Sequence, residues 1–365
     1  MATSSKSDKS ERWDLGGSDL EVLLEEAKRF RGESLWNDAW RRLKRNRSAF
    51  VSLLICAAIL TISFLAPLWP LASPSALDLQ LEPQPPVAPW TQFGRGEWSA
   101  DDYWELSAFD QVLQDTRAWI FGDWQTERWM GTDSKGRDVM SRIIWGSRVS
   151  FQVSIVATLF SLLIGVTYGA FAGFMGGRID NLMMRAVDVL YSIPFIFLVI
   201  FALTLISEYL KQPDSLDIQF MHLFYLLLGL IYWLTMARVV RGQVLTLKNS
   251  EFIEAARVMG ASTARIIFAH LVPNVLSIVI VYLTLTIPAV MLFEAFISFL
   301  GLGVQAPEVS WGLLAGDSIE AMSPVHSYWW LVAWIAAAMG ITLLALNILG
   351  DGLRDALDPK LRGKD

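Results

Sequence analysis

The stretch EFIEAARVMGASTARIIFAHLVPN (residues 251–274) is polar and broken by a glycine, although it lies between two segments apolar enough to sit in lipid. Its first half predicts a short helix. Ser250 is a good N-cap, and Glu251 and Glu254 fall in the first turn, where the positive end of the helix dipole stabilises carboxylates. We expect an apolar stripe along this helix, formed by Phe252, Ile253, Ala256 and Met259.

The second half of the stretch predicts a turn and another short helix. Gly260 suits the left-handed conformation that ends a helix, and Ser262 or Thr263 can cap the helix that follows. That second helix covers residues 265–271 and is expected to end at Pro273, which cannot donate a backbone hydrogen bond. The whole connection is longer than two membrane helices need, which favours a surface that docks on a partner. The alternative is a hairpin that only lies on the membrane surface.

The composition is that of a polytopic membrane protein. Of 365 residues, 53% are apolar and only 18% are charged, and the mean hydropathy is +0.40. These values are too apolar for an ordinary soluble domain. The first apolar run begins near Ala49, too late for a cleaved signal peptide, so we expect it to remain as an anchor. Cys56 is the only cysteine, which excludes a disulfide framework and a cysteine-based metal site.

Six segments carry the roughly 20 apolar residues that a helix needs to cross a bilayer. The fourth of them is the weakest. They cover residues 49–68, 149–175, 187–206, 220–237, 275–293 and 328–349. Pro194 and Pro288 are expected to kink the third and the fifth segment. The predicted fold class is therefore an all-α polytopic membrane protein with six transmembrane helices.

Basic residues near the helix ends predict the orientation. The motif RRLKRNR (residues 41–47) abuts the first segment and places the N-terminus in the cytoplasm, and the other connections on that side are also basic. Residues 67–146, on the opposite side, contain twelve Asp or Glu and six Lys or Arg. Most of the tryptophans also fall on that side, where an amphipathic ring is favoured at the interface.

These assignments divide the chain into five parts. Residues 1–48 form a cytoplasmic tail, with a short amphipathic helix at 10–32 and a basic amphipathic helix at 34–46 that we expect on the inner leaflet. The remaining parts are the first membrane helix, an extracytoplasmic loop, a five-helix core with the inner loop, and a cytoplasmic tail. They cover residues 49–68, 69–148, 149–349 with the loop at 238–274, and 350–365.

Few residues outside the hairpin suggest chemistry. The motif GTDSKGRD (residues 131–138) offers oxygen ligands for calcium, but a glycine turn that caps an interfacial helix is the better interpretation. The three histidines lie on different segments without a carboxylate at ligand spacing, so we expect no metal site. Glu294 is a candidate for an outer gate or a subunit contact, and the alternatives are snorkelling or local pairing. Asp188 and Arg185 are expected to form an i,i+3 pair.

The chain shows no catalytic constellation. There is no nucleophile with a paired base and no G-x-x-x-x-G-K-[ST] motif, so we expect no catalytic residue and no bound cofactor, and ATP must be hydrolysed by another chain. An ion-coupled secondary transporter or channel is the alternative from another class. It would show inverted repeats and charges at the bilayer midplane, and neither is evident in the sequence.

The order Glu-Ala-Ala, three residues, Gly and then a proline before the next membrane helix resembles the "EAA" loop of binding-protein-dependent ABC importers. In that family the loop forms a coupling helix that sits in a groove of the ATPase subunit. The resemblance implies an ATPase-coupling role for Glu254, Ala255, Ala256, Arg257, Gly260, Ala261, Ser262 and Pro273. His270 and Val272 depart from the general pattern, whereas HLVPN (residues 270–274) is similar to the peptide-transporting branch.

Four further motifs resemble that branch: GTDSKGRDVMSRIIWGSRVSF (131–151), GGRIDNLMMR (176–185), SFLGLG (298–303) and GDGLRDALDPK (350–360). The likeness implies the C-type permease subunit of an oligopeptide or dipeptide importer with the type I permease fold, in the bacterial inner membrane. The implied partners are a B-type permease subunit, two ATPase subunits that bind ATP, an extracytoplasmic binding protein, the peptide cargo and the lipid bilayer, but no nucleic acid. Related permeases also carry glutathione-like peptides or nickel chelates, and the sequence leaves these open.

Overall fold

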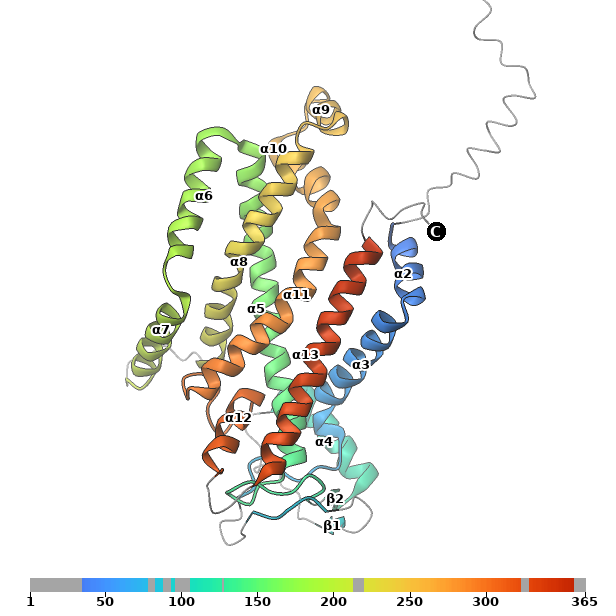
Figure 1. The fold of residues 1–365 in the computed structure, drawn as a ribbon, viewed down its shortest axis with the longest axis vertical. Coiled ribbons are helices and arrows are strands. Elements are labelled where there is room, and N and C mark those ends of the chain that lie inside the picture. Colours follow the sequence, from blue (N-terminus) through green and yellow to red (C-terminus); the bar gives the residue numbers. More distant parts are fainter. Residues whose placement is uncertain are drawn as a thin grey trace, which may run out of the picture.

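The computed structural model describes residues 35–77, 83–87, 93–95, 106–126, 128–212, 220–322 and 328–357, which are almost entirely helical (Figure 1). The helices are α2 (Leu35–Arg45), α3 (Arg47–Phe64), η1 (Ala66–Leu68), α4 (Ala108–Phe121), α5 (Val139–Met175), α6 (Gly177–Ser192), α7 (Phe195–Leu210), α8 (Phe220–Leu247), α9 (Glu251–Val258), α10 (Thr263–Arg265), η3 (Ile266–Leu271), α11 (Val272–Phe299), α12 (Trp311–Glu320) and α13 (Trp329–Leu357). Two short strands, β1 (Phe93–Arg95) and β2 (Trp124–Thr126), pair antiparallel.

Among the described residues, five helical segments are long and apolar enough to cross a membrane, and the pair α6–α7 makes a sixth if it counts as one span. The predicted third span, residues 187–206, is wrong as a single helix because α6 and α7 are bent by 79°. The break lies at Pro194, and the preceding Ile193 is extended with ψ of 128°. Proline disfavours the helical conformation of the residue before it, and here that residue leaves the helix, so the predicted kink is a complete break.

Several membrane helices are longer than the apolar runs that predicted them. α5 begins at Val139 instead of residue 149, α8 continues to Leu247 instead of 237, and α13 reaches Leu357 instead of 349. The carboxylate of Asp138 caps α5 by accepting a hydrogen bond of 2.7 Å from the backbone N–H of Ser141. Hydropathy marks only the part of a helix that contacts apolar surroundings, so the polar ends of these helices were assigned to loops.

Small residues bring α5 and α8 into the most extensive helix contact in the described part of the chain. Gly165, Gly169 and Gly173 follow one another at intervals of four along α5. A Cβ atom on Gly169 would lie 2.3 Å from the carbonyl oxygen of Ala237, and one on Gly173 would lie 2.9 Å from that of Arg241. Small residues at this spacing allow two helix backbones to approach closely in a membrane. The four-residue glycine repeat therefore determines how these two spans pack.

The predicted amphipathic helix at 34–46 is confirmed as α2, and it packs on protein. Ala39 and Leu43 are buried in a cluster that includes residues of α13, and a Cβ atom on Gly352 would meet Ala49. Its contact with the inner leaflet stays a prediction. The helix expected at residues 10–32 lies outside the described residues.

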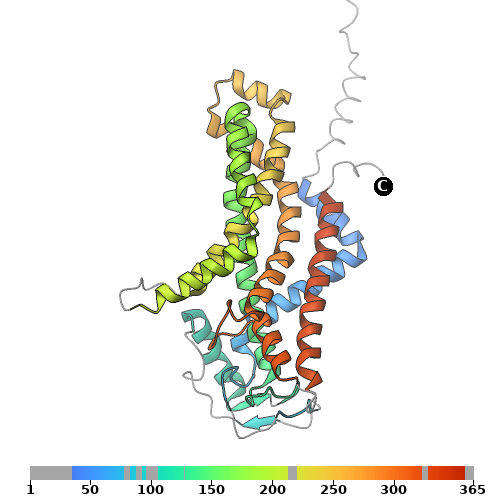
Figure 2. The same cartoon turned by 60° about the vertical axis from the view of Figure 1, so that its left-hand side comes forward.

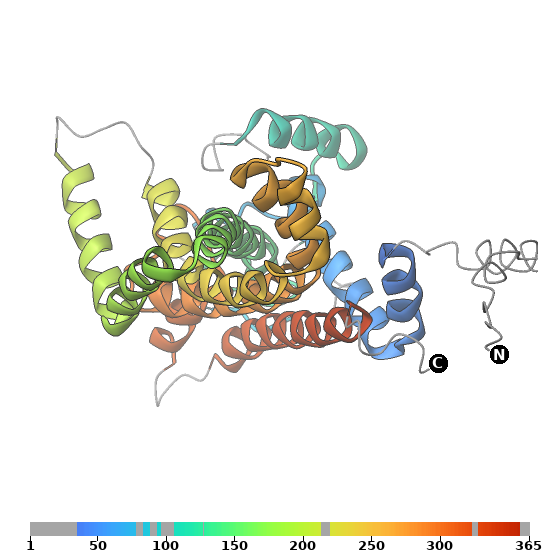
Figure 3. The same cartoon turned by 90° about the horizontal axis from the view of Figure 1, so that it is seen from above.

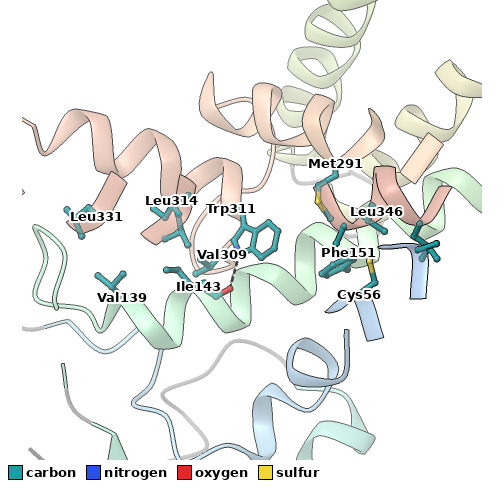
Figure 4. Close-up of a cluster of buried hydrophobic side chains, with 14 of the residues drawn as sticks. Cys56, Val139, Ile143, Phe151, Met291, Val309, Trp311, Leu314, Leu331 and Leu346 are labelled. Atoms are coloured by element: carbon teal, nitrogen blue, oxygen red, sulfur yellow. Dashed lines mark hydrogen bonds between the residues drawn. The ribbon is translucent and has the colours of Figure 1, made fainter. Parts of the chain in front are cut away.

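Three tryptophans that we expected at the outer interface are buried core residues instead: Trp145, Trp311 and Trp330. The indole N–H of Trp311 donates to the carbonyl oxygen of Ile143 over 2.9 Å, which Figure 4 shows as a dashed line between α12 and α5. The indole of Trp330 donates likewise to Thr132 over 3.2 Å. A carbonyl partner inside the fold satisfies the indole N–H, so burial of the whole ring becomes favourable.

The two ends of the molecule carry the features that we assigned to opposite sides of the membrane. Figure 1 shows α9, α2, the start of α6 and the end of α13 at one end, and α4, β1, β2 and α12 at the other. Figure 2 shows the same division from a second direction. The basic connections therefore share one end and the acidic loop occupies the opposite one, as the positive-inside rule requires. Which end faces the cytoplasm stays a prediction.

We expect Gly169→Val to disrupt the α5–α8 contact. The added side chain would meet the backbone of Ala237, which cannot rotate away, and overpacking of this kind costs about 1–3 kcal/mol or more. The measurement is the thermal unfolding temperature of the purified protein in detergent, together with the monodisperse fraction on size exclusion.

The matched control is Gly242→Ala on α8, where a Cβ atom would meet no heavy atom within 4 Å among the described residues. Alanine favours a helix over glycine by about 1 kcal/mol, so this variant should be neutral or slightly stabilised. Equal behaviour of the two variants would contradict the role given to the glycine contact.

Candidate coupling site

The turn at Gly260 has the hydrogen bonds of a Schellman motif, which fixes the direction of the chain after α9. The backbone N–H of Ala261 donates to the carbonyl of Ala256 over 3.0 Å, and that of Gly260 donates to Arg257 over 3.0 Å. Gly260 has φ of 80°, in the left-handed region, as predicted. A Cβ atom there would meet nothing within 4 Å among the described residues, so the demand for glycine comes from the backbone conformation alone.

The cap of the second helix agrees with the sequence prediction, and the cap of α9 differs from it. The hydroxyl of Ser262 accepts a hydrogen bond of 3.3 Å from the backbone N–H of Arg265, so Ser262 is the cap of the second helix. Ser250 holds the N-cap position of α9 with extended backbone, but its hydroxyl donates instead to the carbonyl of Leu247 over 2.6 Å. That bond ties the start of α9 to the end of α8.

Only half of the predicted apolar stripe on α9 is buried. Ile253 and Ala256 pack into a cluster with α5, α8, η3 and α11, and both are almost fully buried. Phe252 and Met259 are exposed instead, Met259 to 79%. Met259 follows Val258, the last residue of α9, and Phe252 lies about 100° around the helix from Ile253, so both point away from the neighbouring helices.

The second helix does not end at Pro273, which corrects our prediction. The π-helix η3 runs into α11, so residues Thr263–Phe299 form one continuous helical segment of 37 residues. Pro273 lies in the first turn of α11, directly after the widened turn. A π turn shifts the register of the backbone hydrogen bonds, and it therefore accommodates a residue that lacks an N–H. The hairpin thus passes into a membrane span without a break.

The outer surface of α9 combines apolar and charged side chains. Val258 is 89% exposed, and the exposed residues around it are Glu251, Phe252, Glu254, Ala255, Arg257 and Met259. The guanidinium of Arg257 lies 5.8 Å from the ring centre of Phe174 near the end of α5. Exposed apolar residues with charges at their edge are typical of a surface that binds another protein. Figure 3 shows this hairpin standing beside the spanning helices when the molecule is viewed from above.

Ion pairs tie the membrane helices together beneath the hairpin. Arg241 on α8 holds Asp180 at the start of α6 through two hydrogen bonds of 2.9 and 2.6 Å. The ammonium group of Lys248 donates to the carbonyl of Gly173 at the end of α5 over 3.3 Å. We did not predict the pair of Asp180 and Arg241, although the acidic residue of GGRID (176–180) was a signal for it.

The predicted pair of Asp188 and Arg185 is wrong, because Asp188 accepts a hydrogen bond of 2.8 Å from Arg238 on α8. The long guanidinium side chain crosses between neighbouring helices, where it also stacks on Tyr191 at 4.4 Å from the ring centre. The pairing therefore links α6 to α8 instead of stabilising one turn of α6.

Glu294, the other predicted site residue, lies near the end of α11 that is remote from the hairpin and is fully buried, which rules out snorkelling. Its carboxylate accepts hydrogen bonds of 3.0 Å from the hydroxyl of Ser150 and of 2.8 Å from that of Ser298. The two serine oxygens in turn accept from the backbone N–H groups of Trp311 and Val304. Glu294 thus connects α5, α11 and the start of α12, and its role as an outer gate or subunit contact stays a prediction.

The motif GTDSKGRD forms the expected glycine turn, with φ of 75° at Gly136. The carboxylate of Asp133 accepts hydrogen bonds from the side chains of Arg137 and Arg142, and both arginines also reach Asp317 on α12 at 3.1 Å. The carboxylate oxygens that the calcium interpretation required already accept hydrogen bonds. Those of Asp133 accept from the two arginines and from backbone N–H groups, and those of Asp138 accept from the backbone N–H groups of Arg128 and Ser141. The motif therefore joins the start of α5 to α12.

Comparison with known proteins identifies relatives over most of the chain. The family "Binding-protein-dependent transport system inner membrane component" matches residues 165–363, and "N-terminal TM domain of oligopeptide transport permease C" matches residues 34–86. The chain is 39% identical to the dipeptide transport system permease protein DppC of Bacillus subtilis, over 90% of this chain and 87% of that protein. It is 40% identical to the oligopeptide transport system permease protein OppC of Haemophilus influenzae, over 91% and 90%. The OppC protein of Escherichia coli K12 is 38% identical, over 91% and 93%.

We expect Ile253→Ala to loosen α9 from the membrane helices, because removing a fully buried isoleucine side chain costs about 2–4 kcal/mol. Hydrogen exchange of residues 251–262 should become faster, while the exposed surface of α9 keeps its side chains. The matched control is Val258→Ala, which removes an exposed side chain and should leave the exchange unchanged. Faster exchange in the control alone would show that the packing of α9 has been misassigned.

Proposed function

The chain belongs to the family of binding-protein-dependent transport system inner membrane components and is a permease subunit of an oligopeptide or dipeptide ABC importer, and from this premise we propose that residues 251–262 are the surface through which ATPase subunits drive the membrane helices. The permease itself is not catalytic and is a multi-pass protein of the inner membrane. The system requires a binding protein and ATPase partners. This family membership sets aside the alternative of an ion-coupled secondary transporter.

The continuity of the hairpin with a membrane span carries the proposal. The exposed face of α9 is joined by the turn at Gly260 to the helical segment Thr263–Phe299. On its other side, Ser250 and Lys248 connect the hairpin to α8 and α5. A displacement of α9 therefore acts on three spans, because the turn at Gly260 and the bonds of Ser250 and Lys248 join it to them.

The transport step follows from this rigid connection. ATP binding draws the ATPase subunits together, α9 moves with the subunit on which it docks, and the attached spans change their tilt. The passage for the peptide then switches from inward to outward access. We infer an assembly with one B-type permease subunit, two ATPase subunits and one extracytoplasmic binding protein, with the N-terminus of this chain in the cytoplasm. The roles of Glu254, Ala255, Ala256, Arg257, Gly260, Ala261, Ser262 and Pro273 are part of this proposal.

We expect the hairpin end to face the cytoplasm, which single cysteines in a Cys56→Ser background test with an impermeant thiol reagent. Gln305 at the acidic end and Thr263 in the hairpin are both exposed and are suitable labelling sites. Ser310, near Gln305, is fully buried and therefore unsuitable. In sealed cells Gln305→Cys should react and Thr263→Cys should react only after permeabilisation. The reverse pattern would overturn the orientation.

We expect Gly260→Val to insert in the membrane but to lose ATP-dependent peptide uptake. A β-branched residue in the left-handed region costs roughly 1–2 kcal/mol, so the Schellman turn changes its geometry. Glu254→Lys should act through the surface instead, because it reverses an exposed charge near the N-terminus of α9. Both variants are measured by uptake in proteoliposomes and by retention of the ATPase subunits in a pull-down.

Two controls separate turn geometry from general damage. Gly260→Asn should retain most uptake, because asparagine tolerates the left-handed conformation. Lys211→Ala, an exposed change directly after α7 and away from the hairpin, should behave as wild type. Normal uptake and normal ATPase retention in both Gly260→Val and Glu254→Lys would refute the coupling proposal.

A further inference from the structure

The helix α4 in the outer loop buries a polar face and exposes an apolar one, the reverse of a helix on the surface of a soluble protein. Its buried positions are Asp110, Gln114 and Arg117, all polar. Its exposed side chains include four large apolar ones: Phe109, Val112, Trp119 and Ile120. The polar residues recur at intervals of four and three, and the apolar ones recur on the other side of the helix, so each set occupies one face. In water, such a helix would present its apolar face to solvent at a cost in free energy.

The inward polar face is held by specific contacts, so the orientation of α4 is determined. Asp110 accepts a hydrogen bond of 2.6 Å from the guanidinium of Arg148 on α5. Asp110 and Ser107 also form a capping box at the start of the helix. Near the other end, Arg117 donates to the carbonyl of Leu71 over 3.2 Å. These contacts attach α4 at both ends with its apolar face turned outward.

The same contacts place α4 at the level where the first span ends. Ser63, in the last turn of α3, forms a hydrogen bond of 2.6 Å with Ser147, the neighbour of Arg148. The apolar run of α5 starts directly after Arg148. Both spans therefore pass from apolar to polar surroundings beside the first turn of α4. Figure 3 shows α4 at the periphery of the molecule, outside the packed spans.

We propose that α4 is an interfacial helix that inserts its apolar face into the outer leaflet of the lipid bilayer. Phe109, Val112, Trp119 and Ile120 lie in the region between head groups and acyl chains, with Trp119, 86% exposed, at the interface that tryptophan favours. The polar face anchors the helix to the protein and the apolar face anchors it to lipid. The outer loop is thereby held close to the membrane surface.

A lipid surface fits this face better than another protein chain does because the face continues the exposed surface of a peripheral span. α4 packs against η1, which follows α3 directly, and Ile62, Phe64 and Trp69 in this region are also exposed. α3 has the smallest buried share of the five candidate spans. The exposed apolar surface thus runs from α3 onto α4 at the height of the bilayer boundary.

The test compares two labelled sites on opposite sides of α4. Gln111 and Ile120 are both exposed and are nine residues apart, about two and a half helical turns, so they point in opposite directions. Each is replaced, as Gln111→Cys or Ile120→Cys in a Cys56→Ser background, and labelled with an environment-sensitive fluorophore in the full transporter in nanodiscs. Quenching is measured with nitroxide phosphatidylcholine and with aqueous iodide.

The ratio of lipid quenching to iodide quenching should be at least about five-fold higher at position 120 than at position 111, as expected for a helix lying in the interface. Protection of position 120 from both quenchers would show that a protein partner covers the face, and iodide quenching equal to that at position 111 would show that it lies in water. Either result overturns the proposal.

An unlabelled measurement guards against disturbance by the fluorophore. The emission of Trp119 is the difference between the fluorescence of the wild type and that of Trp119→Phe. Brominated phosphatidylcholine should quench this difference. If the Trp119 emission is insensitive to brominated lipid, the proposal fails. Neither measurement depends on ATP, so this outcome is independent of the coupling proposal.

Discussion

Gly169 on α5 lies so close to α8 that a Cβ atom there would sit 2.3 Å from the carbonyl oxygen of Ala237. In lipid, apolar side chains gain little from packing on one another, so close backbone approach and polar pairing must hold the helices together. The glycine contact places the ends of α5 and α8 side by side. The pair of Arg241 and Asp180 and the bond from Lys248 to Gly173 depend on that placement, and so does the position of the hairpin that follows α8.

The polar groups inside the fold are arranged so that each end of the molecule is tied across several helices. At the hairpin end, ion pairs join α6 to α8. At the outer end, Glu294 and the cluster around Asp133 join α5 to α11 and α12. A buried charge without partners is costly, so the contacts of the buried Asp133, Asp180 and Glu294 favour one arrangement of the helices.

Sequence reasoning succeeded where local chemistry decides the structure. The left-handed turn at Gly260 and the cap at Ser262 follow from residue type and the hydrogen bonds of neighbouring residues. It failed where the deciding contact comes from elsewhere in the chain. The burial of Trp311 depends on a carbonyl of α5. Asp188 pairs with Arg238 of α8, a partner 50 residues away in the chain. One local feature was also not predicted: the π turn at Ile266–Leu271 carries the helix past Pro273, and residue type does not mark such a turn.

The sequence by itself determined the family, five of the six predicted spans and the position of the turn at Gly260, because hydropathy and short motifs are properties of neighbouring residues. Only the tertiary structure decided which face of each helix is covered. It divided the apolar residues of α9 between the core and the surface, and it turned the polar face of α4 inward. The physical reason is that burial depends on the partner helix, and the ion pair of Asp110 with Arg148 joins residues 38 positions apart. No local pattern specifies such a partner.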